Sequence, residues 1–397
     1  MNRRWVTGWV ITMVTLVAPI LIHGAVVDDL ITYSNSLGKN WLSTRLATYP
    51  TTNIVIAPPS VMGTLGIIGT GTAGKTRADW QSALGLSRKK QTDIIRGFSL
   101  FHSLLTDPTI DITLNTADSI WIQADSRLQE AFIKTSVEFY DAPVQKINFS
   151  APDSLATIQK WISGKTNRII QSFPSSLEPT ASLLVLNTLF FKGDWQFPFN
   201  AKKTDDRLFI SPGLPPIKTP MMVHFGRFQY AETREVQAIA LPYGEGRFEL
   251  VIVAPRQWTP PHLPWDYLAG SDYDAFEETP VTIVLPKFKL TVRNALRAPL
   301  SDAGFQSLFS PRADFSGISP TVKLSDIVQQ VVVIVDESGT RAAATTSGTF
   351  GSTSVSTARP ASIMLTRPFL YALRDTISGL YLFIGAYVAP EDSIDVP

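Results

Sequence analysis

Cysteine is absent from this chain of 397 residues, which excludes disulfide bonds, zinc-thiolate sites and a thiol nucleophile. An excess of charge of one sign is also absent. The 35 basic and 34 acidic residues leave a net charge of +1, so no overall field attracts nucleic acid. Beyond residue 25 the histidines are His102, His224 and His262, in no metal-ligand spacing. No Gly-x-Ser-x-Gly nucleophile elbow occurs. We therefore expect no catalytic residues, no metal and no cofactor.

The first 25 residues have the pattern of a secretory signal. A basic start precedes a largely apolar run over residues 5–22, and Gly24-Ala25 supply small side chains after it. This order predicts a signal peptide over residues 1–25 and a secreted, extracellular protein. The apolar run is also long enough for an uncleaved membrane anchor. The sequon Asn148-Phe149-Ser150 predicts a glycoprotein modified at Asn148.

The chain as a whole is 44% apolar, which is ample for a large core, and no internal repeat or linker divides the part beyond residue 25. Helical periodicity dominates the first half and strand patterns dominate the second, which indicates an α+β fold. The predicted helices cover residues 28–46, 60–68, 126–140, 155–170 and 294–305, and the predicted strands cover 111–123, 183–191, 281–290, 331–335, 369–388 and several short segments between 207 and 255.

A phosphate-loop pattern is present at Gly69-Thr-Gly-Thr-Ala-Gly74-Lys75-Thr76. In a nucleotide hydrolase, Lys75 and backbone amides would hold phosphates and Thr76 would hold magnesium. Val331–Glu337 even imitates the strand that ends in a magnesium-side aspartate. However, the residues before the pattern start a helix better than a strand, and a secretory N-terminus does not suit an ATP site. A glycine-rich turn between helices is the other interpretation, and the sequence favours it.

Short charged runs carry weaker signals. Asp205-Asp206 and Glu277-Glu278 lie in polar surroundings that solvated loops explain better than acid/base chemistry. Arg88-Lys89-Lys90 predicts a solvated helix start, with weak binding of heparin-like polyanions as the alternative.

One long segment, at about residues 337–360, is unlike the rest of the chain. No charge occurs from Ala342 to Ala358, and no proline occurs before Pro360. Its threonines favour extended structure, and every residue before Pro360 can donate a ladder hydrogen bond. Strand patterns precede and follow it. Long connections of this kind are usually functional or disordered, so we predict an exposed loop that can become a strand, with a flexible linker as the alternative.

Several motifs in fixed order resemble the serpin family over almost the whole mature chain, 26–397. Any one of them is moderate evidence, whereas their joint order and spacing is specific. The resemblance implies a single α+β domain with three β-sheets, about eight or nine helices and an exposed reactive-centre loop. The matching segments are Asn53 with Pro58 and Ser60, Gly71 with Gly74 and Thr76, Asn187–Trp195 with Phe199, Met221-Met222, Leu241–Tyr243, Leu285–Lys289, Ala313–Ser319 and Arg367–Phe369.

The resemblance also implies a function. A serpin of this kind is a monomeric suicide substrate of a serine protease. The protease attacks the loop and becomes acylated by its upstream part, which then inserts as a new central strand. The family's usual hinge length places the cleaved bond at Thr353-Ser354. Thr353 is small and β-branched, which favours an elastase-like target, whereas Phe350-Gly351 would offer a chymotrypsin-like site. The hinge residues are Glu337, Gly339, Thr340, Ala342, Ala343 and Ala344.

The hinge of this chain suits insertion. Alternate residues of an inserted strand face the core, and Arg341, which replaces the family's usual acidic residue, falls on the outer face. A one-residue slip would bury it. The alternative, a non-inhibitory serpin acting as a carrier or chaperone, would be favoured by a bulky or proline-containing hinge. The inward-facing residues are uncharged: Thr340, Ala342, Ala344, Thr346, Gly348 and Phe350.

The region where the family's sheet opens departs from the usual pattern. A serine is replaced by Ala57 and a histidine by Gln329, so we expect Ser60, Asn187 and Gln329 to rebuild part of the polar cluster there. At the top of the sheet, beside Trp195, the resemblance implies a salt bridge between Lys287 and Glu337.

Overall fold

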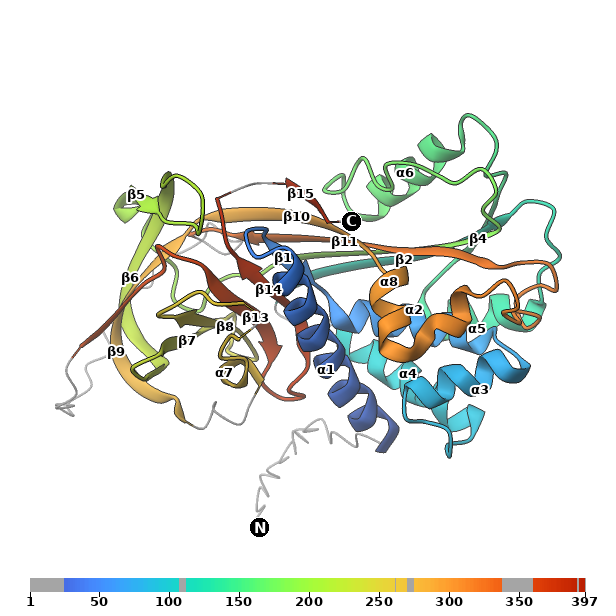
Figure 1. The fold of residues 1–397 in the computed structure, drawn as a ribbon, viewed down its shortest axis with the longest axis horizontal. Coiled ribbons are helices and arrows are strands. Elements are labelled where there is room, and N and C mark those ends of the chain that lie inside the picture. Colours follow the sequence, from blue (N-terminus) through green and yellow to red (C-terminus); the bar gives the residue numbers. More distant parts are fainter. Residues whose placement is uncertain are drawn as a thin grey trace, which may run out of the picture.

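The computed structural model describes residues 25–106, 112–260, 262–269, 275–337 and 360–390, and the backbone of Ser393–Val396. Within these ranges the strands form two hydrogen-bonded sheets, and most of the helices gather at one side of the molecule (Figure 1). The helices are α1 (Ala25–Thr48), α2 (Pro58–Thr70), α3 (Gly74–Ala83), α4 (Gln91–Thr106), α5 (Glu130–Tyr140), α6 (Ser154–Lys165), α7 (Asp266–Ala269) and α8 (Arg297–Leu300).

The six-stranded sheet has the order β15-β10-β11-β4-β2-β3. Its central strand β4 is apolar almost throughout because both faces are covered. Residues such as Leu183 and Phe191 belong to the main core, whereas Leu186 and Phe190 pack into a second cluster with Ile158 of α6. The strands are β2 (Thr113–Gln123), β3 (Val144–Ile147), β4 (Leu183–Lys192), β10 (Phe288–Ala295), β11 (Leu324–Val335) and β15 (Ser393–Val396).

The second sheet has nine strands, in the order β1-β14-β13-β8-β7-β6-β9-β12 with β5 also paired to β6. Two of the three expected sheets are continuous here, because the 16-residue strand β6 pairs with β9 along much of its length and with β7 near its end. The strands are β1 (Ile54–Ile56), β5 (Asp205–Phe209), β6 (Ile217–Glu232), β7 (Val236–Tyr243), β8 (Phe248–Pro255), β9 (Glu277–Pro286), β12 (Ala361–Met364), β13 (Phe369–Asp375) and β14 (Tyr381–Tyr387).

Helix α2 lies in the core, and its residues from Pro58 to Gly69 are buried. Its glycines permit close packing of aromatic rings. A Cβ atom at Gly66 would lie 2.5 Å from the ring of Phe98, and one at Gly69 would lie 2.1 Å from the ring of Trp80. Real Cβ atoms do not approach so closely, so packing density fixes glycine at these positions.

Several predicted elements differ from the structure. The strand predicted over residues 369–388 is a pair of antiparallel strands, β13 and β14. The helices predicted over 126–140 and 155–170 are shorter, since α5 begins at Glu130 and α6 ends at Lys165.

The single strand expected over residues 281–290 is two strands in different sheets, since β9 ends at Pro286 and β10 begins at Phe288. The helix expected over 294–305 begins later, because β10 continues to Ala295. The short α8 follows, and then a π-helical turn in which Gly304 has a φ of 97°. Apolar pattern alone did not reveal either boundary, because both flanking elements are buried.

Candidate functional site

The predicted reactive loop connects the two sheets. Strand β11 ends at Val335 in the six-stranded sheet, and β12 begins at Ala361 in the nine-stranded sheet. The predicted cleaved bond Thr353-Ser354 lies outside the described residues. The hinge residues other than Glu337 also lie outside them, and their roles remain predictions.

The seam between β4 and β11 is the place where a new strand would have to enter. These two strands are direct parallel neighbours, paired from Leu183 with Leu324 to Phe191 with Val333. The described structure is therefore a closed sheet, with the two strands hydrogen-bonded to each other. A segment that turned back from the end of β11 would run antiparallel to β11, and hence antiparallel to β4 as well, so it could form a regular ladder with both.

A row of four polar side chains crosses this seam. Asp118, Asn187, Gln329 and Asn294 are register partners on β2, β4, β11 and β10. Asn187 donates a hydrogen bond through Nδ2 to Asp118. Gln329 donates through Nε2 to Asn187 Oδ1 at 3.0 Å, and Asn294 donates through Nδ2 to Gln329 Oε1 at 3.4 Å. One continuous hydrogen-bond chain thus spans four strands.

The start of α2 and strand β1 cap this row. Gln329 accepts from the backbone amide of Ala57 at 3.2 Å and donates to the Ala57 carbonyl at 3.0 Å. Asn294 donates to the Val55 carbonyl at 3.0 Å. Ser60 contacts the row through its backbone. Its carbonyl oxygen accepts from Asn187 at 3.4 Å, whereas its hydroxyl has no hydrogen-bond partner within the described ranges.

The carboxyl group of Asp118 is the titratable member of the row. It lies under α2, and its Oδ2 would be 3.7 Å from a Cβ atom at Gly63. Burial raises the pKa of Asp118 to about 7, against the effect of the hydrogen bond from Asn187, which lowers it. The nearby charge of Asp141 raises it further. At neutral pH this carboxyl group is therefore only partly ionised, although an ordinary aspartate would be fully charged.

Glu337, the first hinge residue, is anchored where β11 ends. Lys287 donates through Nζ to its Oε2 at 2.8 Å, which is the salt bridge that the resemblance implied. Thr204 donates to its Oε1 at 2.9 Å, and the backbone amide of Phe199 donates to its carbonyl at 2.9 Å. Partial burial raises the pKa of Glu337, but the hydrogen bonds from Lys287, its own backbone and Thr204 outweigh that effect and lower it overall.

Trp195 stabilises the same end of β11. Its indole Nε1 donates to the Asp336 carbonyl at 2.7 Å, and its ring stacks on Tyr243 with centroids 4.1 Å apart. Asp336 and Glu337 are thus tied by side chains from other strands and loops.

The phosphate-loop pattern does not form a phosphate site. Helix α2 precedes it where a buried strand is required, so the turn-between-helices interpretation is confirmed. Lys75 is 86% exposed at its side chain and pairs with Asp79 at 2.7 Å. The hydroxyl of Thr76 accepts from the backbone amide of Asp314 at 2.9 Å. The same turn packs tightly, because a Cβ at Gly317 would lie 2.8 Å from the carbonyl oxygen of Gly71.

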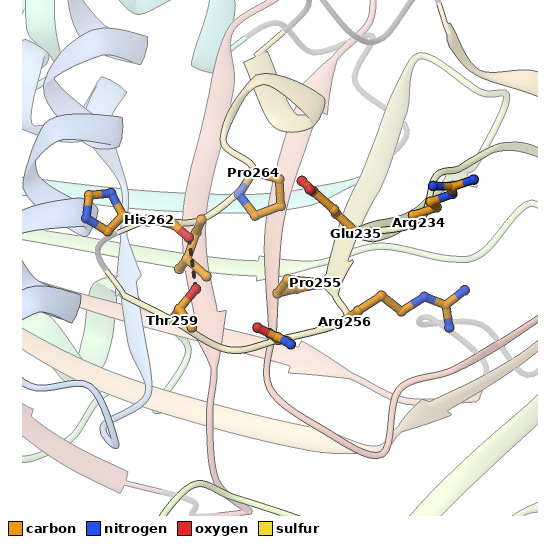
Figure 2. Close-up of a pocket in the computed structure, with 9 residues that line it drawn as sticks. Arg234, Glu235, Pro255, Arg256, Thr259, His262 and Pro264 are labelled. Carbon is orange, nitrogen blue, oxygen red and sulfur yellow. Dashed lines mark hydrogen bonds between the residues drawn. The ribbon is translucent and has the colours of Figure 1, made fainter.

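A cavity of about 470 Å³ lies near the ends of β7 and β8. Figure 2 shows Arg234 and Arg256 pointing to one side of it and the ring of His262 pointing away from them. Arg256 is engaged with Glu232, to which it donates a hydrogen bond. These side chains do not converge on a common point, so the cavity offers no catalytic arrangement.

Three further observations concern the remaining predicted features. Asn148 is exposed, and its Oδ1 accepts from the amide of Ser150 at 3.1 Å. No helix in the described part of the chain combines the length and apolarity needed to cross a bilayer. The described side chains also contain no group of three or more metal-ligating residues.

Sequence reasoning identified Asn187, Gln329 and the pair formed by Lys287 and Glu337, but it missed Asp118 and Asn294. Asp118 lies in a mostly polar stretch, residues 115–119, and Asn294 directly follows Arg293 in a strand of alternating character. Neither position therefore stood out from its neighbours in the sequence. Only the strand register shows that these two residues align with Asn187 and Gln329.

Comparison with known proteins agrees with this architecture. A family model described as Serpin (serine protease inhibitor) matches residues 32–390. Iripin-3 of Ixodes ricinus is 29% identical over 372 residues, which cover 90% of this chain and 94% of that protein. Plasminogen activator inhibitor 1 of Bos taurus is 28% identical over 85% of this chain and 87% of its own length.

Solved structures show the same fold. Native protease nexin-1, crystallised with heparin, matches with a TM-score of 0.78 at 22% identity, over 92% of this chain and 99% of that one. Serpin-12 of Manduca sexta matches with a TM-score of 0.77 at 22% identity, over 91% and 99%. The chain therefore belongs to the serpin family, whose members are generally inhibitors of serine proteases and not catalytic enzymes.

Proposed function

We propose that this protein is a secreted, inhibitory serpin that traps a serine protease by inserting its cleaved loop between β4 and β11. The observation that carries the proposal is the closed parallel seam, which leads directly into the uncharged loop. Insertion would replace the single ladder of hydrogen bonds between β4 and β11 with two ladders, one on each side of the new strand. A gain of about ten hydrogen bonds at about 1 kcal/mol each would supply on the order of 10 kcal/mol.

The same geometry supports a change that is triggered by cleavage of the loop. The loop is held at Glu337 on one side and enters β12 at Ala361 on the other. While the loop is intact, residues near Thr353 cannot travel down the seam, because β12 is paired with β9. Cutting Thr353-Ser354 frees the upstream part, and the acylated protease would move with it.

The target is an elastase-like protease if Thr353 occupies its specificity pocket. A chymotrypsin-like protease would instead cut beside Phe350, which leaves a shorter segment for insertion. One serpin monomer would form a covalent complex with one protease molecule. Arg88 and its two lysine neighbours offer weak polyanion binding as an additional feature.

A panel of serine proteases tests the mechanism. An inhibitory serpin forms a complex that survives SDS, and mass spectrometry of the released C-terminal peptide identifies the cleaved bond. Thr340→Arg places a charge on the inward face of the inserted strand and should convert the inhibitor into a substrate. Arg341→Glu changes charge on the outward face and should retain inhibition.

The carrier or chaperone alternative predicts the opposite result. If proteases cut at residues 353–354 and turn over freely, with no SDS-stable complex, the inhibitory proposal is wrong. The family assignment would stand in that case, because it depends on the fold and not on the loop.

A further inference from the structure

A cavity of about 490 Å³ lies where the two sheets meet, at the end of β11. Four segments line it: the start of β6, the junction of β9 and β10, the end of β11 and the end of β14. In Figure 1 the ends of β10 and β11 approach β6 and β9 at this corner. The volume falls in the range of small-ligand sites, about 300 to 1,000 Å³.

The lining is strongly basic, although the chain as a whole is almost neutral. Lys218, Lys287 and Lys289 contribute three positive charges, and Asp336 contributes the lining's one carboxylate. Asp336 already has a cationic neighbour, because its Oδ2 lies 3.9 Å from Lys192 Nζ. Within the described ranges, neither Lys218 nor Lys289 has an ion-pair partner, so the described part of the lining carries an excess of positive charge.

One wall of the cavity is apolar. Phe288 is 6% exposed and Tyr387 is 1% exposed, and their rings stack with centroids 4.7 Å apart. A low-dielectric wall strengthens the attraction between the lysine ammonium groups and an anion held against it. Lysine ammonium groups on flexible stems can also adjust to different oxyanion shapes.

We propose that this cavity binds a small anion carrying at least two negative charges, of the class of tricarboxylates or pyrophosphate. Lys218 would bind it from β6, and Lys289 would bind it from β10. Lys287 would contribute a further ammonium hydrogen while still donating to Glu337. The ligand would therefore join the two sheets beside the hinge. This inference does not depend on the protein being an inhibitor.

Binding of this kind would stabilise the closed sheet. The three lysines come together only when β6, β9 and β10 are in place, so the anion binds the native arrangement and not the unfolded chain. Stabilisation by such a ligand grows with its concentration relative to the dissociation constant. Occupied protein should melt at a higher temperature than free protein.

Isothermal titration calorimetry of the intact chain with citrate and with pyrophosphate, at constant ionic strength, tests the site. The double variant Lys218→Ala/Lys289→Ala should weaken binding at least tenfold and abolish the ligand-induced rise in melting temperature. Lys146→Ala/Lys160→Ala is the matched control, because it removes two exposed lysines elsewhere and changes the net charge equally. Melting without ligand establishes that both variants are folded, and Lys218→Met/Lys289→Met provides a second pair with more side-chain bulk.

Two results would overturn the proposal. Equal loss of binding in both double variants would mean that anion binding depends only on the net charge of the protein. Absence of binding to the intact chain would mean that the lysines are not available, for instance because Glu391 and Asp392, which follow Pro390 in the sequence, neutralise them. A difference between citrate and pyrophosphate would identify which oxyanion chemistry the cavity prefers.

Discussion

Replacing Asp118 with asparagine should remove most of a pH dependence from the stability of this fold. The pKa of Asp118 is about 7 in the folded protein, against 3.8 for an ordinary aspartate. Because the folded value is raised, the native state favours the protonated form. Its stabilising contribution is complete below pH about 3.8 and is lost as the pH rises through 7.

The magnitude follows from these two values. Relative to the protonated form, the carboxyl group costs the native state about 1.6 kcal/mol at pH 5 and about 4 kcal/mol at pH 8. The asparagine side chain would keep an oxygen that accepts from Asn187 and would have no proton to lose. The free energy of unfolding of Asp118→Asn minus that of the parent should therefore grow by about 2.5 kcal/mol from pH 5 to pH 8.

Denaturant-induced unfolding followed by tryptophan fluorescence, at several pH values, measures this difference. The histidines His102 and His224 also have lowered pKa values through burial, but their titration cancels between variant and parent. Asp153→Asn is the control, because Asp153 is exposed, and its profile should parallel the parent. A constant difference between Asp118→Asn and the parent from pH 5 to pH 8 would refute the assignment of this titration to Asp118.

Three other predictions concern the hinge, the loop and the glycine-rich turn. Lys287→Ala should speed conversion to a latent form, in which the uncut loop has inserted, or to polymers, and native gels measure this conversion. Since the pKa of Glu337 is lowered, the contribution of the Lys287–Glu337 pair to the stability of the intact form should be lost as the pH falls through that lowered value. An unchanged conversion rate in Lys287→Ala at neutral pH would show that the pair has no such role. Chain cut at residues 353–354 should melt well above intact chain by calorimetry, because insertion adds a ladder, and equal melting temperatures would contradict the stored-energy mechanism. Gly69→Ala should destabilise the fold by about 1 to 3 kcal/mol through overpacking against Trp80, whereas Lys75→Ala should leave stability almost unchanged, and detectable magnesium-ATP binding that depends on Lys75 would contradict the structural interpretation of that turn.

Much of the fold was predictable because its elements have strong local patterns. The buried strand β4 is a continuous apolar run, and helix α1 has clear helical spacing. The break at Lys287 was not predictable, because β9 and β10 are both apolar and differ only in the sheet that they join. The seam residues were predictable in part: the family motif located Asn187, but only strand register shows that Asp118 and Asn294 share its row.

The polar row also indicates how the sheet would divide on the proposed mechanism. Gln329 is bonded twice to Ala57 and once to Asn294, so it stays with β10 and the start of α2. Asn187 stays with Asp118, and its longer bond to the Ser60 carbonyl, at 3.4 Å, also links β4 to α2. The row contains one side-chain bond between β4 and β11, from Gln329 to Asn187. A neutral bond of this kind contributes about 0.5 to 1.5 kcal/mol, so the row resists opening only weakly and leaves most of the resistance to the backbone ladder. Because an inserted strand restores that ladder on both sides, the closed seam can be stable until the loop is cut and unstable afterwards.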